Sequence, residues 1–114
     1  MKLVMTKSKT MSATAIFEIG QILHHRMFDY RGVVLDVDPN FQGGEEWYEK
    51  MAHSHPPKDQ PWYHMLVDNS SNPTYVAERN LEPSEDIGPI NHYLLDQGLM
   101  RYKYGRYLIE RRLI

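Results

Sequence analysis

The sequence predicts a small, mainly β protein whose strands close into a barrel. Two stretches of alternating apolar residues, 22–26 and 31–38, flank a short turn, as expected for a β-hairpin. A third strand is predicted at 62–68. The chain has 114 residues, a length that suits one domain. Several short strands, joined by turns and one long loop, are typical of a small all-β barrel.

The predicted strand 31–38 is rich in valine, and β-branched side chains favour strands. Strict alternation divides it into two faces, one with Val33, Leu35 and Val37 and the other with Val34, Asp36 and Asp38. Pro39 cannot donate to a strand ladder and is expected to end the strand. Gly20, which precedes the hairpin, is expected to allow a bend or the close approach of another backbone segment.

The remaining elements are predicted from local signals. Residues 39–60 form a long loop with one or two helical turns at 45–51, followed by a fourth strand at 74–77 and a single turn at 78–81. A short helix is expected from Pro89 to Gln97, because proline suits the first helical position and Gly98 suits the end. We therefore expect a flexible arm at 1–16, a barrel domain at 17–83 and an appendage at 84–114. The tail at 101–112 could pack on the barrel, bind a partner or stay disordered.

Composition excludes several classes of protein and site. The chain has no cysteine, which excludes a disulfide framework, a thiolate nucleophile and a cysteine-based zinc site. Its apolar runs fall short of the roughly 18 residues that span a bilayer, so no membrane partner is expected. The basic N-terminus lacks the apolar segment of a secretory signal, and a cytoplasmic location is expected. Met11 is an alternative to Met1 as the start.

Charge is distributed unevenly along the chain. The net charge is −2, but residues 1–31 carry +3, residues 32–100 carry −9 and residues 101–114 carry +4. Nucleic-acid-binding domains are usually basic over a broad surface. DNA contacts would therefore come from a local patch, for which the candidates are His24, His25, Arg26, Arg31, Arg101, Lys103 and Arg106. The alternative is an ordinary solvated surface of mixed charge.

The sequence carries no catalytic signature. A Gly-rich phosphate loop, G-x-S-x-G and H-E-x-x-H are all absent, and no cofactor is expected. Asp36 and Asp38 are more simply explained by a strand that ends at the surface than by acid–base catalysis. The six histidines show no standard ligand spacing, so no metal site is predicted. Trp47 and Tyr48 lie among glutamates, and if exposed they suit a protein partner better than DNA.

Four ordered blocks resemble a known family. They are F-E-I-G-Q-I (17–22) with His24, Y-R-G-V-V-L-D-V-D-P (30–39), Q-P-W-Y-H-M-L-V-D (60–68) and Y-V-A-E-R-N-L-E (75–82). Together they resemble the heat-shock protein Q family, also called the hemimethylated-DNA-binding or YccV-like domain. The resemblance covers about residues 17–82. The basic tail and the N-terminal arm depart from the family pattern.

The resemblance implies an SH3-like, strongly bent β-barrel and a bacterial, stress-associated protein without enzymatic activity. It implies two alternative roles. One is binding DNA, with a preference for hemimethylated DNA and an association with the nucleoid. The other is acting as a specificity-enhancing adaptor, and itself a substrate, of the Lon protease. Homo-oligomerisation stays open. The matched residues Gly20, Gly32, Pro39, Trp62 and Tyr63 suggest architectural roles, while Arg31 and His64 serve either contacts or the fold.

Overall fold

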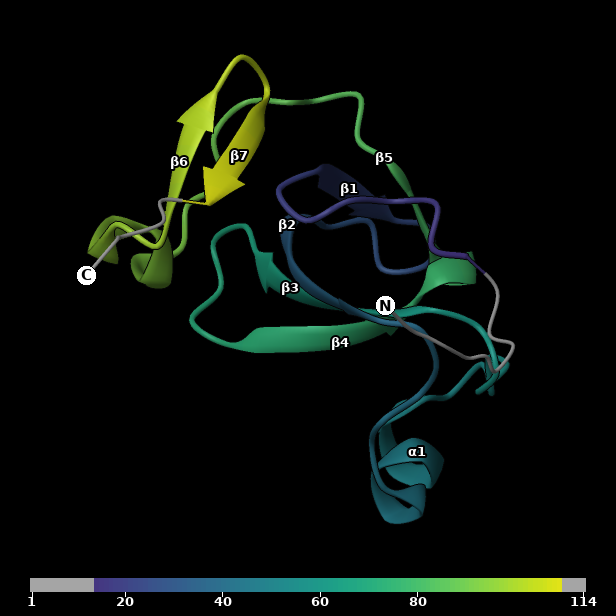
Figure 1. Cartoon of the computed structure of the whole chain (residues 1–114). Helices are drawn as coiled ribbons and strands as arrows, with labels where there is room; N and C mark the ends of the chain where they lie inside the picture. Colours follow the sequence, from purple (N-terminus) through teal and green to yellow (C-terminus); the bar gives the residue numbers. More distant parts are fainter. Residues whose placement is uncertain (1–13, 110–114) are drawn as a thin grey trace, which may run out of the picture.

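The computed structural model describes residues 14–109. Its helices and strands follow in the order β1 (Ile22–His25), β2 (Arg31–Asp38), α1 (Glu45–Met51), β3 (Trp62–Val67), β4 (Pro73–Ala77), η1 (Glu78–Asn80), β5 (Leu81–Pro83), η2 (Tyr93–Gln97), β6 (Met100–Lys103) and β7 (Arg106–Ile109), where η marks a 3₁₀ helix. Figure 1 shows the first five strands at the centre, with the β6–β7 hairpin at one end of them and α1 at the other.

The five central strands form one antiparallel sheet in the order β4-β3-β2-β1-β5, and β6 and β7 form a separate two-stranded sheet. The mainly β prediction is confirmed. Closure into a barrel is not confirmed, because the larger sheet ends at β4 on one side and at β5 on the other and stays open.

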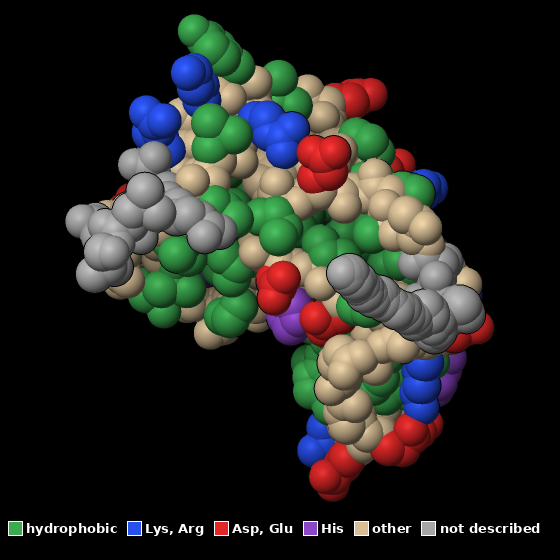
Figure 2. Space-filling view, in the orientation of Figure 1, with side chains coloured by type: hydrophobic (Ala, Val, Ile, Leu, Met, Phe, Trp, Pro, Cys, Tyr) green, Lys and Arg blue, Asp and Glu red, His purple; other side chains and the backbone are tan. Residues whose placement is uncertain are grey.

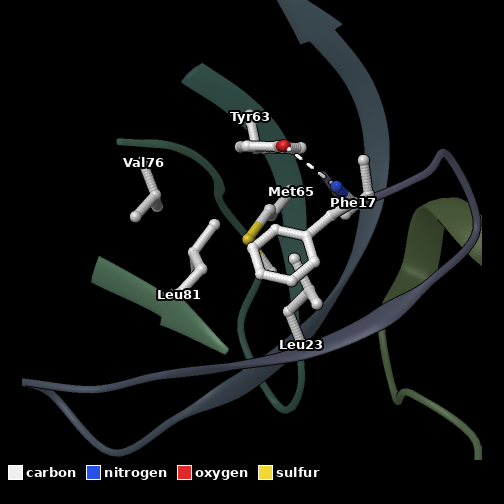
Figure 3. Close-up of a cluster of buried hydrophobic side chains, with 7 residues drawn as sticks. Phe17, Leu23, Tyr63, Met65, Val76 and Leu81 are labelled. Atoms are coloured by element: carbon white, nitrogen blue, oxygen red, sulfur yellow. Dashed lines mark hydrogen bonds between the residues drawn. The ribbon is translucent and has the colours of Figure 1, made fainter. Parts of the chain in front are cut away.

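One face of the larger sheet, which we call the inner face, carries the main apolar cluster. Figure 3 shows side chains from β1, β3, β4 and β5 converging there. Its buried members are Phe17, Leu23, Val34, Tyr63, Met65, Val76 and Leu81. The Phe17 backbone N–H donates a hydrogen bond of 3.2 Å to the Tyr63 hydroxyl, which itself donates to Glu78. The segment that enters the sheet is thus anchored at both its side chain and its backbone.

The opposite face, which we call the outer face, is covered at its two ends by different elements. At one end, Ile22, Val33 and Leu66 pack in one cluster with Ile90, Met100 and Tyr107. At the other end, α1 and its C-terminal turn contribute Tyr48 and Ala52 to a cluster with Trp62 and Ala77. The hairpin and α1 therefore share one sheet face and leave its middle between them (Figure 1).

A β-bulge in β2 overturns the predicted alternation of that strand. Val34 pairs with Met65, but Asp36 pairs with His64, so the register shifts by one residue at Leu35. Neighbouring residues of β3 point to opposite faces. Val34 therefore lies on the inner face, whereas Asp36 and Asp38 lie on the outer face. The prediction that all three share one face was wrong because a bulge inserts an extra residue into the period.

The short-range predictions agree closely with the structure. The predicted strand 31–38 and the predicted helical turns 45–51 have the bounds of β2 and α1. The helix expected from Pro89 is shorter and of 3₁₀ type, beginning at Tyr93 after the His92 ring accepts a hydrogen bond from the Leu94 N–H. Residues 1–13, which hold both candidate starts and most of the predicted arm, and residues 110–114 lie outside the described residues.

Candidate nucleic-acid interface

The β6–β7 hairpin is a two-stranded ribbon with distinct faces. Its loop has two residues, Tyr104 (φ 53°) and Gly105 (φ 82°). Left-handed conformations at both positions are those of a type I′ turn, which matches the twist of the flanking strands. The strand pairs Met100–Ile109 and Tyr102–Tyr107 alternate with Arg101–Leu108 and Lys103–Arg106. Because partners in a pair share a face, the three basic side chains of the hairpin lie on one face together.

That basic face points away from the sheet. Met100 and Tyr107 are buried against the sheet, whereas Arg101, Lys103 and Tyr104 are exposed, Tyr104 by 91%. The Lys103 Nζ lies 5.6 Å from the centroid of the Tyr104 ring. Figure 2 shows basic side chains gathered over this hairpin. The ribbon thus presents two exposed cations and one large aromatic ring to solvent.

A close backbone approach holds the hairpin on the sheet. The Tyr107 N–H donates to the Gly20 carbonyl at 2.8 Å, and Gly20 has a φ of 92°. A Cβ at Gly20 would lie 1.9 Å from the Tyr107 carbonyl oxygen, so a side chain does not fit there. Tyr107 also receives a hydrogen bond of 2.8 Å from the Ile90 N–H. The predicted role of Gly20 in a close backbone approach is confirmed.

Arg106 differs from its neighbours on the basic face. Its guanidinium donates to Glu18 at 3.3 Å and to the Ile19 carbonyl at 3.2 Å, and it is less exposed than the side chains at the tip. It therefore ties β7 to the segment before β1. Of the three basic residues predicted for this segment, Arg101 and Lys103 are the more exposed.

The structure gives Arg31 an architectural position. Its side chain is only 17% exposed and forms ion pairs of 3.3 Å with Asp68 and 3.5 Å with Asp86. It also donates to the backbone carbonyls of Asp86, Gly88 and Pro89. The contacts with Asp86, Gly88 and Pro89 fix the segment that leads to the hairpin, and Asp68 directly follows β3. Arg31 is therefore a poor candidate for a phosphate contact.

The two histidines of β1 are also occupied within the protein. The His24 ring contacts Asp29 through Nε2 and Glu82 through Nδ1, each at 2.7 Å, and these carboxylates raise the pKa of His24 above its usual value. His25 is buried, and its Nδ1 accepts the N–H groups of Met27 and Phe28. Burial lowers the pKa of His25 and disfavours its cationic form. The charge of a protonated His24 is offset by its two carboxylates, and His25 is disfavoured as a cation, so neither ring adds net positive charge to a DNA-binding surface.

Arg26 lies away from the hairpin. Its side chain is 56% exposed, donates to the Leu81 carbonyl at 3.3 Å and lies 3.9 Å from a Glu82 oxygen. It follows the C-terminal end of β1, whereas Gly20 and β7 lie beside the start of that strand. The candidate residues near β1 and those of the tail therefore do not form one continuous patch.

The two aromatic candidates near α1, Trp47 and Tyr48, differ in their exposure to solvent. Tyr48 is buried, and its hydroxyl donates to the Pro56 carbonyl at 2.6 Å. Trp47 is partly exposed and packs edge-on against Tyr75, with ring centroids 5.8 Å apart. Acidic residues surround them, since Glu45 and Glu46 lie in the first turn of α1. Acidic side chains at this end disfavour the approach of a phosphate backbone, and Tyr48 is buried.

Tyr104 is the residue that the sequence predictions missed. A Tyr-Gly pair between two stretches of alternating residues was the available signal, since glycine favours the second position of a type I′ turn.

Among the described residues, none of the helices has the length and apolar character that a membrane span needs. A comparison with protein families gives one further finding. The model of a family described as "Hemimethylated DNA-binding protein YccV like" matches residues 15–106, a range that includes the hairpin up to Arg106.

Proposed function

The chain belongs to the YccV-like family of hemimethylated DNA-binding proteins, and on that premise we propose that it binds duplex DNA through the β6–β7 hairpin. The observation that carries this proposal is the outward basic face of the hairpin. A two-stranded β-ribbon fits into the major groove of B-DNA. Arg101 and Lys103 would neutralise backbone phosphates, while the buried face of the hairpin keeps the ribbon fixed on the sheet.

The shape of the tip suits the reading of base methylation. The exocyclic amino group of adenine and the 5-position of pyrimidines lie in the major groove, so a methyl group there meets a protein that enters this groove. The exposed Tyr104 ring stands at the free end of the ribbon. We infer that its apolar surface contacts a base methyl group, which would give one methylated strand an advantage over none.

The decisive experiment is a titration of fluorescent duplexes with the full chain. Unmethylated, hemimethylated and fully methylated duplexes of one sequence are compared at two salt concentrations. We expect binding at low salt that weakens steeply at high salt, because phosphate contacts release counterions. We also expect the hemimethylated duplex to bind more tightly than the unmethylated one. A lack of binding at low salt would overturn the DNA role, and equal affinities would overturn the preference alone.

A second candidate function is that of an adaptor for a Lon-type protease. Its support is an apolar surface beside the β1–β2 turn, where Met27 and Phe28 are 53% and 62% exposed and Met51 is 55% exposed. These three side chains line one pocket of the molecule. Substrate turnover by purified protease would rise on addition of the chain and fall back with Phe28→Ser. An unchanged turnover with the unaltered chain would exclude this role.

The remaining parts of the proposal concern context. We propose that the protein acts by binding, without catalysis of its own, in a bacterial stress response and in association with the nucleoid. Protein levels before and after a heat shock test the first association. Imaging of the tagged chain against stained DNA tests the second, with a diffuse signal as the contrary result.

A further inference from the structure

Two carboxylates and one imidazole converge on the uncovered middle of the outer face. Asp36 and Asp38 project from β2, and His64 projects from the neighbouring β3. One ligand atom from each of the three lies within 4.8 Å of the others. The closest pair is His64 Nε2 and Asp38 Oδ2, at 3.0 Å. Figure 2 shows a histidine with acidic side chains in the hollow between the main body and α1.

The β-bulge is what brings these groups together. Without it, Asp36 and Asp38 would share the inner face with Val34, opposite to His64. The shifted register instead places Asp36 directly across from His64, with Asp38 two residues further along the same face. Bulges frequently re-aim side chains next to functional sites. The cluster therefore depends on a specific irregularity of the strand.

Hydrogen bonds from neighbouring groups orient both carboxylates. The Tyr75 hydroxyl donates to Asp38 Oδ2 at 2.7 Å, and itself accepts the Gln42 N–H at 3.0 Å. The Val37 N–H donates to Asp36 Oδ1 at 2.9 Å. Hydrogen bonds of this kind hold the ligands of metal sites in place and tune their basicity. These bonds engage Asp38 Oδ2 and Asp36 Oδ1.

The cluster also opens into a defined recess. A pocket of about 350 Å³ is lined by two of the three residues, Asp38 and His64, together with Gln42, Gly43, Gly44, Trp47 and Tyr75. This leaves room for water molecules beside Asp38 and His64. The recess lies within the segment 32–100, whose net charge of −9 favours the binding of a cation.

We propose that Asp36, Asp38 and His64 bind one divalent transition-metal cation such as Zn²⁺, with water completing its coordination. Imidazole nitrogen and carboxylate oxygen are both zinc ligands, and three protein ligands plus water make an open tetrahedral site. Zinc bonds of about 2.1 Å place ligand atoms roughly 3.4 Å apart. Because the three ligand atoms lie within 4.8 Å of one another, binding requires the side chains to draw closer together.

His24 shows why not every such group makes a metal site. It also contacts two carboxylates, but Asp29 and Glu82 bind different nitrogens of its ring. The carboxylates thus lie at separate edges of the imidazole and cannot share one ion with it. At His64 the carboxylates converge. This proposal concerns the middle of the outer face, away from the hairpin tip, and does not rest on DNA binding.

The test is calorimetric titration of the metal-free full chain with ZnCl₂, repeated with Asp36→Asn and His64→Gln. Circular dichroism checks that each variant is folded. Because Asp36 is exposed, we expect Asp36→Asn to disturb the fold less than His64→Gln does. His53→Ala removes an imidazole outside the cluster and serves as the control. We expect one ion per chain, about 100-fold weaker binding in the two variants, about tenfold weaker binding in Tyr75→Phe and no change in the control.

Absorption of the Co²⁺-loaded protein provides a second readout. Coordination by His64 gives visible bands that are lost in His64→Gln. Three results would overturn the proposal. They are no binding by the unaltered chain, binding by both Asp36→Asn and His64→Gln that is as tight as that of the unaltered chain, or loss of binding in the His53→Ala control alone.

Discussion

The β6–β7 hairpin and α1 cover the same face of one sheet but carry opposite charge. The hairpin presents Arg101 and Lys103 to solvent, whereas α1 begins with Glu45 and Glu46. Their apolar sides are equivalent, since each buries a tyrosine against the outer face. The difference lies only in the side chains that point outward. A chain with a net charge of −2 can therefore still present a basic surface at one end.

This polarity also sets an orientation. Charges interact over about 8 Å at physiological ionic strength, so each end acts on a ligand almost independently. DNA bound at the hairpin tip leaves α1 and the recess beside it facing away. The acidic end then remains accessible to a cation or to a protein while DNA is bound.

The largest expected effect comes from detaching the hairpin. In Gly20→Ala, the new Cβ meets the Tyr107 carbonyl and the residue keeps a left-handed φ. We expect the free energy of unfolding to fall by about 3–4 kcal/mol and DNA binding to be lost. Urea denaturation and duplex titration measure the two effects. Gly44→Ala, where a Cβ would meet nothing within 4 Å, is the control. Equal stability of both variants would contradict the proposed docking.

Next in size is the loss of Arg31. Arg31→Met leaves Asp68, which is 18% exposed, without its cation and strands three backbone carbonyls. We expect the free energy of unfolding to fall by about 2–3 kcal/mol. Arg31→Lys should restore only part of it, because an ammonium cannot reproduce the guanidinium fork. Thermal denaturation measures both variants. A stable Arg31→Met variant that has lost DNA affinity would mean that Arg31 contacts DNA.

A smaller effect is expected on the salt dependence of DNA binding, and it should differ between the two ends of the molecule. Lys103→Gln on the hairpin should make the plot of log K against log salt shallower by about 0.9, the share of one phosphate contact. Lys50→Gln on α1 changes the same charge at the other end and should leave the slope unchanged. Fluorescence anisotropy at several salt concentrations gives both slopes. Equal changes in the two variants would show that the charge acts through the whole molecule.

The smallest effect concerns His24. Its raised pKa means that the paired, protonated ring stabilises the fold fully below the unfolded value of 6.5. This contribution is lost as pH rises through the folded pKa. The melting temperature of the unaltered protein should therefore exceed that of His24→Gln at about pH 6, and the difference should shrink by about pH 9. A difference that is constant with pH would contradict the ion pairs with Asp29 and Glu82.

Local signals predicted most of the central sheet, but contacts between distant segments were beyond them. The valines of β2, the stop at Pro39 and the helical turns at 45–51 depend on neighbours in sequence, and they were predicted correctly. The bulge at Leu35 was missed because it depends on how β2 pairs with β3. The open edges of the sheet depend in the same way on long-range pairing. Patterning alone cannot distinguish an open, bent sheet from a closed barrel.

The candidate site was predicted in part for the same reason. Exposure of Arg101 and Lys103 follows from alternation along β6, which residue types suggest. The internal roles of Arg31 and His25 cannot be predicted in this way. The partners of Arg31 lie in the distant segment 84–90, and His25 accepts a backbone N–H that only the folded turn brings to it. Basic residues look alike in sequence whether they bind a phosphate or a carbonyl of their own chain.

The central claim is that the hairpin end, and not the α1 end, contacts DNA. Its most direct test is an NMR titration of the ¹⁵N-labelled full chain with a short hemimethylated duplex at low salt. We expect backbone amide shifts to concentrate in β6, β7 and the Tyr104–Gly105 loop, with the amides of α1 unmoved. Shifts concentrated in α1 or around Arg26, with the hairpin unmoved, would contradict it.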